Sequence, residues 1–278
     1  MREILKCGRF DLKLDGLPLV MGILNVTPDS FSDGGRYQGL EFALSRAEEM
    51  IADGVDMIDV GGESTRPGSP SVPALEELQR VMPALYALRE LGKPLSVDTC
   101  KPEVMREAIL AGADMINDIN AFRAPGALEA VIDSDCGLCV MHMQGTPQHM
   151  QEQPVYQDVV REVIEFLRER VDTMVAAGIE RARICVDPGF GFGKTIEHNY
   201  ALLRHLGQIR QELALPVLAG LSRKSMIGAV IGKPVEQRLA GSLAGALASV
   251  AHGARIVRVH DVAETVDALK VWRAATAD

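Results

Sequence analysis

Eight short apolar runs recur along the chain, and longer segments with helical periodicity separate them. In one such segment, apolar residues from Tyr156 to Met174 recur every three or four positions. Short strands that are apolar throughout are typical of a parallel sheet with helices on its faces. The predicted strands cover residues 19–24, 57–60, 94–97, 115–116, 137–141, 184–186, 216–219 and 256–259.

This alternation of strands and helices indicates an α/β fold. Eight units in 278 residues leave about 35 residues for each, which suits a (β/α)8 TIM barrel formed by one domain over residues 1–278. A doubly wound parallel sheet is the alternative. Segments 4–7 and 10–14, separated by Gly8 and Arg9, predict a short N-terminal β-hairpin that plugs the N-terminal end of the barrel.

Acidic residues outnumber basic ones by 38 to 29, which gives a formal net charge of −9. This balance argues against nucleic acid or an anionic membrane as a partner, so an anionic ligand must be met by local basic groups. Five cysteines are too few for a disulfide scaffold in a chain of this length. Because the N-terminal segment also lacks a signal-peptide core, we expect a cytoplasmic protein.

Polar side chains follow every predicted strand. In a barrel these positions converge on one face, where barrel enzymes hold their active sites. Helix N-caps would explain one or two of them, but not the bases Lys224, Arg258 and His260, which follow the last two strands and predict an anion site. The polar positions are Asn25, 61–66, Asp98, Asn117, Asp118, His142, Asp187, 222–224, Arg258 and His260.

Three loops are rich in glycine. Residues 25–35 and 61–68 also contain Pro, Ser and Thr, and their length and position predict active-site lids. Residues 189–195 resemble a phosphate-binding P-loop, but that pattern requires Gly where Pro188 stands. We interpret these glycines as letting the backbone approach a flat ligand beside Asp187.

The two lid loops, followed by SVDTCKPEV at 96–104, closely resemble the dihydropteroate synthase family. The resemblance continues in order through NDI at 117–119, MHMQG at 141–145, DPGFGFGK at 187–194, GLSRKSMIG at 220–228 and RVHDV at 258–262. It implies a sulfonamide-inhibited barrel transferase of folate synthesis, a homodimer with Mg²⁺ as its metal. Such an enzyme joins hydroxymethyl-dihydropterin pyrophosphate to 4-aminobenzoate, forming dihydropteroate and releasing pyrophosphate.

The resemblance also implies roles for individual residues. Asp98, Asn117 and Asp187 would pair with the pyrimidine edge of the pterin, and Lys224 would donate to its ring carbonyl and ring nitrogen. Arg258 would stack on the pterin and hold the pyrophosphate with His260. The other assignments are Asn25 as the Mg²⁺ ligand, Asn25 and Thr65 at the pyrophosphate, and Phe31, Thr65, Arg66, Pro67, Phe192 and Ser222 around the aminobenzoate.

The expected chemistry is a dissociative displacement without a general base, because an aromatic amine is already uncharged at neutral pH. Arg258, His260 and Lys224 would act as the catalytic residues by stabilising the leaving group and holding the pterin. Cys100 stands where the family pattern has Ser, and residues 120–123 are less typical of it. The small-residue segment 241–251 would pack either in the homodimer or against the barrel.

Two other functions are compatible with a pterin-binding barrel. A methyltransferase would pass a methyl group from methyl-tetrahydrofolate to a corrinoid, but it has no pyrophosphate to hold, so the predicted anion site disfavours it. A noncatalytic homologue would bind pterins without turning them over. The presence of Asn25, Asp98, Arg258 and His260 argues against that homologue.

Overall fold

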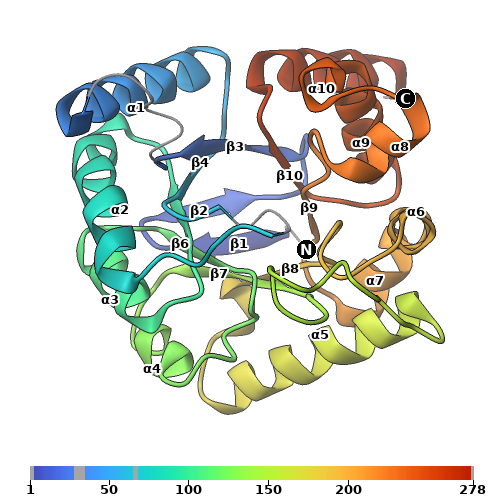
Figure 1. The fold of residues 1–278 in the computed structure, drawn as a ribbon, viewed down its shortest axis with the longest axis horizontal. Coiled ribbons are helices and arrows are strands. Elements are labelled where there is room, and N and C mark those ends of the chain that lie inside the picture. The colour runs from blue at the N-terminus through green and yellow to red at the C-terminus, as the bar shows by residue number, and fades with distance from the viewer. Residues whose placement is uncertain (1–2, 28–34, 65–67, 277–278) are drawn as a thin grey trace.

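The computed structural model describes residues 3–27, 35–64 and 68–276, and a barrel of parallel strands lies at its centre (Figure 1). Within these residues the barrel sheet has eight strands in the order β8-β7-β6-β5-β4-β3-β10-β9, and a bridge between Val186 and Val217 joins its two edges. The strands are β3 (Leu19–Asn25), β4 (Met57–Gly61), β5 (Leu95–Asp98), β6 (Met115–Asp118), β7 (Gly137–Met141), β8 (Ile184–Asp187), β9 (Leu218–Ala219) and β10 (Ile256–Val259). The predicted (β/α)8 barrel is confirmed, and the open doubly wound sheet does not form.

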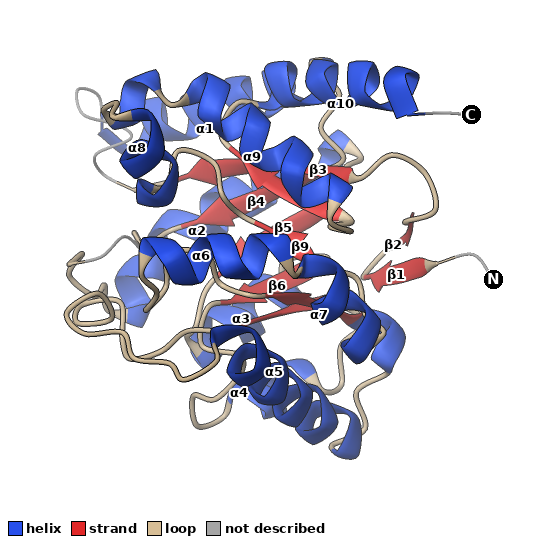
Figure 2. Ribbon diagram, turned by 90° about the vertical axis from the view of Figure 1, so that its right-hand side faces the viewer, coloured by secondary structure: helices blue, strands red, loops and turns tan. Residues whose placement is uncertain are grey.

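Helices cover the outside of the barrel (Figure 2). They are α1 (Gly35–Ala52), α2 (Ala74–Leu88), α3 (Pro102–Leu110), α4 (Ala127–Val131), α5 (Val159–Ala176), α6 (Ile196–Arg204), α7 (Leu206–Leu213), α8 (Ser225–Ile231), α9 (Leu239–Ala251) and α10 (Val262–Thr276). Short 3₁₀ helices η2 (Arg89–Leu91), η3 (Arg181–Arg183) and η4 (Val235–Gln237) lie in the connections. None of the helices in the described residues is long and apolar enough to cross a membrane.

Helix α5 shows how local sequence sets an element boundary. The apolar spacing begins at Tyr156, but the helix begins at Val159 because the Asp158 side chain accepts hydrogen bonds from the backbone N–H groups of Val160 and Arg161. Its periodic apolar residues are buried against the barrel, as the spacing predicts. Tyr156 instead donates its hydroxyl to the carbonyl of Gly193, 2.8 Å away.

Several strands extend further than the apolar runs predict. β3, β5 and β8 end on the polar residues Asn25, Asp98 and Asp187, and β6 includes Asn117. The register pairs Asn25 with Gly61, Gly61 with Asp98, and Asp98 with Asn117. The ladder therefore continues through residues whose side chains are polar, because backbone hydrogen bonding does not depend on side-chain type. The side chains of Asn25, Asp98 and Asn117 therefore follow one row around part of the barrel.

The N-terminal hairpin seals one end of the barrel, as predicted. β1 (Ile4–Cys7) pairs antiparallel with β2 (Phe10–Lys13), one residue shorter than expected. Figure 2 shows it at one end of the barrel. Its buried residues form an apolar cluster with side chains from the N-terminal ends of the barrel strands: Leu5, Cys7, Leu14, Met21, Met57, Met115, Cys139, Cys185, Leu218 and Ile256. The hairpin thus closes the face opposite to the strand-end polar residues.

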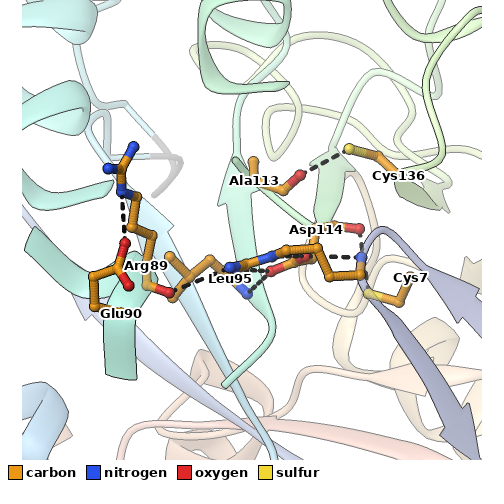
Figure 3. A network of polar contacts seen from close by, with 8 residues as sticks. Cys7, Arg89, Glu90, Leu95, Ala113, Asp114 and Cys136 are labelled. Carbon is orange, nitrogen blue, oxygen red and sulfur yellow. Dashed lines mark hydrogen bonds and ion pairs between the residues drawn. The ribbon is translucent and has the colours of Figure 1, made fainter. Parts of the chain in front are cut away.

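A polar network fastens this hairpin to the barrel (Figure 3). Arg9 contacts Asp114 through Nη2 to Oδ2 at 2.8 Å and Nε to Oδ1 at 2.9 Å. The Asp114 carboxylate, which is 1 % exposed, also accepts from the backbone N–H of Leu95 at 3.0 Å. The Cys7 thiol donates to the Asp114 carbonyl at 3.3 Å. Both carboxylate oxygens of Asp114 are therefore hydrogen-bonded.

Candidate active site

Three charged side chains meet inside the C-terminal half of the barrel. Arg258 of β10 lies between Asp59 of β4 and Asp98 of β5, with Nε 2.6 Å from Asp59 Oδ2 and Nη2 2.8 Å from Asp98 Oδ2. Both carboxylates are buried, whereas the Arg258 side chain is 19 % exposed. Asp59 follows Met57 by two positions, so strand alternation places both side chains in the barrel interior.

This cluster has unused hydrogen-bonding capacity. Asp59 Oδ1, Asp98 Oδ1 and Ser96 Oγ are buried without a hydrogen-bond partner in the described part of the chain. Burial raises the pKa of Asp98 to about 7, although the neighbouring Arg258 charge lowers it. Buried acceptors without partners are costly, so the arrangement suits a ligand that brings N–H donors.

Asn117 of β6 completes one side of the cluster. Its register position is directly opposite Asp98, and its Nδ2 donates to Asp59 Oδ2 at 3.3 Å. Its side-chain amide thereby offers both donor and acceptor groups next to two carboxylates. The next residue, Asp118, turns away from the interior. Its carboxylate accepts from the backbone N–H groups of Asn120 at 2.7 Å and Phe122 at 2.6 Å, and so holds the following loop.

Asp187 and Lys224 form the opposite side of the site. Asp187 Oδ1 accepts from the backbone N–H of Gly189 at 2.7 Å, and burial raises the pKa of Asp187 while Lys224 lowers it. The Lys224 ammonium donates to the Phe190 carbonyl and lies 4.7 Å from the centre of the Phe192 ring. Burial lowers the pKa of Lys224 to about 8, with Asp187 opposing that shift.

His260 and Ser222 lie close together just beyond β10 and β9. Ser222 Oγ accepts from the backbone N–H of His260 at 3.2 Å and lies 3.0 Å from His260 Nδ1. The Ser222 hydroxyl, predicted to contact the aminobenzoate, therefore orients the imidazole in this structure. Arg223, the residue after Ser222, links the loop after β9 to the residue after His260, because its Nε lies 3.0 Å from Asp261 Oδ2.

Asn25 ends β3 opposite Gly61, and a Cβ at position 61 would lie 3.4 Å from Asn25 Oδ1. The glycine leaves space at this amide oxygen. In the described residues, no group of three or more His, Cys, Asp or Glu side chains is arranged to hold a metal. A single amide oxygen nevertheless fits Mg²⁺, a hard cation that takes oxygen ligands and retains water and phosphate oxygens as the others.

A cavity of about 310 Å³ adjoins Asp98. Its walls come from the end of β5 and from the loops after β4, β5, β6 and β7: Glu63, Ser64, Ser69, Ser71, Asp98, Thr99, Cys100, Lys101, Ile119, Thr146, Pro147 and Gln148. Small-molecule sites start at about this size. Cys100, the departure from the family pattern, therefore lies at the edge of the site and is partly buried.

The lid predictions fall mainly outside the described residues, which exclude 28–34 and 65–67. Phe31, Thr65, Arg66 and Pro67 belong to these segments. Phe192 is described and is buried beside Ile119, Met141, Met143 and Met150. The structure thus brings together Asp98, Asn117, Asp187, Lys224, Phe192 and Arg258.

Sequence reasoning missed Asp59, which lies in the run 57–60 that we interpret as an apolar strand. A carboxylate within a strand buried on both faces was the available signal. It also missed Lys101, which contacts the carboxylates of Glu63 and Glu77. Glu63 Oε1 in turn accepts from the backbone N–H of Val72 at 3.0 Å, so this ion cluster joins both ends of the loop after β4.

Known proteins with similar sequences and structures identify the family of this chain. Residues 21–260 match the family described as pterin binding enzyme. The dihydropteroate synthase of Haemophilus influenzae is 52% identical over 259 residues, covering 93% of this chain and 94% of that protein. The synthase of Burkholderia cenocepacia, solved with 7,8-dihydropteroate, is 56% identical with a TM-score of 0.91, and the alignment covers 99% of this chain and 97% of that one.

The synthase of Xanthomonas albilineans, solved with 4-aminobenzoic acid, is 50% identical with a TM-score of 0.93 and is covered in full, as is this chain. These sequence identities extend over nearly the whole chain, which also contains the predicted motifs and folds into the predicted barrel. The strand-end cluster described above also suits a donor-rich heterocycle. The chain therefore belongs to the pterin-binding enzyme family and, within it, to the dihydropteroate synthases, which are transferases.

Proposed function

We propose that this chain transfers the pterinylmethyl group of hydroxymethyl-dihydropterin pyrophosphate to the amine of 4-aminobenzoate, giving dihydropteroate and pyrophosphate. The observation that carries this proposal is the Asp59–Arg258–Asp98 cluster, whose buried carboxylate oxygens lack partners in the described residues. A pterin has an amino group and a ring N–H on one edge, which are the donors that such oxygens require.

Pterin recognition involves both sides of the barrel interior. Asp98 and Asn117 accept from and donate to the pyrimidine edge, and Asp187 pairs with it from the opposite side. Lys224 donates to the ring carbonyl and the ring nitrogen. Its charge is held near the site by Asp187 and by the Phe190 carbonyl, which supports this role.

Pyrophosphate binding is assigned to the groups at the ends of β3 and β10. Arg258 presents a planar guanidinium that stacks on the pterin and donates to the leaving group, and His260 donates beside it. Thr65 contacts the same group. Asn25 would hold Mg²⁺ through Oδ1, and the cation, when bound, would supply positive charge for the pyrophosphate. The open space next to Asn25 Oδ1 supports this assignment.

The aminobenzoate pocket is assigned to Phe31, Thr65, Arg66, Pro67, Phe192 and Ser222. The carbon–oxygen bond to pyrophosphate breaks ahead of attack, so positive charge develops on the exocyclic carbon of the pterin as pyrophosphate leaves. The amine of 4-aminobenzoate then bonds to that carbon and releases its proton to water. Because the amine is uncharged, no residue has to abstract a proton before attack. Arg258, His260 and Lys224 promote the step by stabilising the leaving group and by fixing the pterin ring.

We also propose that the protein is a homodimer and that it is cytoplasmic. Gly241 and Gly245 of α9 face Ile227 of α8, where a Cβ at Gly241 would collide with the Ile227 side chain. Their small size is therefore used in packing within the chain. The more exposed positions of α9 are the ones available to a second copy.

The test is to measure pyrophosphate release and dihydropteroate formation with hydroxymethyl-dihydropterin pyrophosphate, 4-aminobenzoate and Mg²⁺. We expect product only when all three are present. Tight pterin binding without product would instead identify a noncatalytic homologue, and no pterin binding would contradict the site assignment.

A pair of lysine variants tests the role of Lys224 in pterin binding. Lys224→Met should weaken pterin binding at least about tenfold because it removes a charged donor to the ring. Lys270→Met is the matched control, since the Lys270 side chain is 64 % exposed on α10. Equal affinities of the two variants, measured by calorimetry, would refute the role of Lys224.

A further inference from the structure

The glycine-rich loop after β8 ends in a lysine that the proposed reaction does not use. Lys194 is 2 % exposed. Its ammonium nitrogen lies 2.9 Å from His142 Nδ1, 3.0 Å from the Phe192 carbonyl oxygen and 3.3 Å from the His142 carbonyl oxygen. The ion pairs found within the described residues do not include Lys194. The Lys194 side chain is thus buried with neutral hydrogen-bond partners, and burial lowers its pKa well below the ordinary value while the Asp187 charge opposes that shift.

Each of these three groups can accept an N–H from the Lys194 side-chain nitrogen. Burial lowers the pKa of His142 to about 2, so its ring is neutral and Nδ1 can accept from Lys194. The His142 ring is itself fixed, since it lies edge-on to Phe166 with 4.9 Å between the ring centres. Lys194 therefore ties two loops together, the one after β7 and the one after β8.

The backbone of the loop after β8 packs closely against the loop after β7. Gly189 and Gly193 have φ of +72° and +63°, and a Cβ at either would collide with the carbonyl oxygen of His142 or Gln144. These glycines bring the backbone against the loop after β7, where Lys194 makes its hydrogen bonds. The motif that resembles a P-loop is thus explained by backbone packing.

This same loop holds Lys224. The Phe190 carbonyl accepts from the Lys224 ammonium, and the Phe192 ring lies against it. The Phe192 carbonyl is the group that Lys194 binds. We propose that Lys194, together with His142, is a positioning residue for Lys224: it fixes the Phe190–Phe192 backbone so that the Lys224 ammonium points at the pterin. The proposal rests on the function proposed above.

The experiment is a double-mutant cycle read by calorimetric titration with hydroxymethyl-dihydropterin pyrophosphate. Lys194→Met retains the length of the side chain and removes its donors. We expect it to weaken pterin binding about tenfold in the otherwise wild-type enzyme. In a Lys224→Met background the same substitution should change pterin affinity by less than about twofold, because its effect passes through Lys224.

A second pair of variants tests the partner. His142→Asn retains an acceptor near the position of Nδ1 and should bind pterin as the wild type does, whereas His142→Leu should behave as Lys194→Met does. If Lys194→Met does not fold, the two His142 variants still test whether the Lys194–His142 contact affects pterin binding. The proposal would be overturned if Lys194→Met lowered pterin affinity equally with and without Lys224. It would also be overturned if neither Lys194→Met nor His142→Leu lowered pterin affinity. Failure of the wild type itself to bind pterin would instead refute the proposed function.

Discussion

The two ends of the barrel are built from the same strands but have opposite chemistry. At the N-terminal end the interior side chains are apolar, for example Met57 and Met115, and the hairpin covers them. Two residues further along the same strands, the interior positions hold Asp59 and Asn117. The barrel interior therefore changes from apolar to polar between two successive inward-facing positions of each strand, which are two residues apart.

The two ends also differ in how their charges are satisfied. Asp114 at the hairpin has hydrogen-bond donors on both carboxylate oxygens. Asp59 and Asp98 at the other end share Arg258, and each has one oxygen without a partner in the described residues. A buried carboxylate with hydrogen bonds to both oxygens contributes to stability, whereas a buried oxygen without a partner can accept a hydrogen bond from a ligand. The comparison separates residues that hold the barrel together from those that bind.

Removing an arginine at each end gives the largest expected contrast. Arg258→Met should lower kcat/KM by about a thousandfold, because two buried carboxylates lose their shared cation and the leaving group loses a donor. Arg9→Met is the control at the hairpin, and its kcat/KM should stay within about twofold of wild type. Steady-state kinetics on both folded variants measures the difference. A similar loss in both would show that the two ends are not functionally distinct.

The apolar end should respond in stability. Leu5→Ala should lower the free energy of unfolding by about 3 kcal/mol, because Leu5 is fully buried in the plug and its truncation leaves a cavity. Turnover by the folded enzyme should be unchanged, since the plug lies at the end opposite to the site. Denaturant unfolding and kinetics at one temperature test this. Reduced turnover without reduced stability would contradict the division between the ends.

The smallest expected effect is a pH dependence at the polar end. Burial raises the pKa of Asp98 to about 7, so between its unfolded value of 3.8 and 7 the folded protein binds a proton that the unfolded chain has lost. Stability should therefore fall as pH rises through this window, by about 2 kcal/mol between pH 5 and 7. Asp98→Asn should remove this part of the dependence. Parallel pH profiles for variant and wild type would contradict the shifted pKa.

Much of the fold could be predicted from local sequence. The runs 137–141 and 256–259 coincide with β7 and β10, and the hairpin is one residue shorter than predicted. Some boundaries differ where a polar residue joins the ladder, as at Asn25, or where a cap starts a helix late, as at Asp158. The predictions 216–219 and 94–97 also begin too early, since β9 begins at Leu218 and β5 at Leu95. Apolar periodicity describes burial, and backbone hydrogen bonding can extend past the buried residues.

The candidate site was predictable only where polarity interrupts an apolar pattern at a strand end, as at Asp98, Asp187 and Arg258. The barrel itself could be predicted from local sequence, because apolar periodicity is a property of neighbouring residues. Two contacts could not be predicted in this way and come from the folded chain: Asp59 pairs with Arg258, 199 positions away, and Lys194 and Lys224 bind carbonyl groups of the same loop. Such contacts depend on strand register and barrel closure, which bring together residues that share no local pattern.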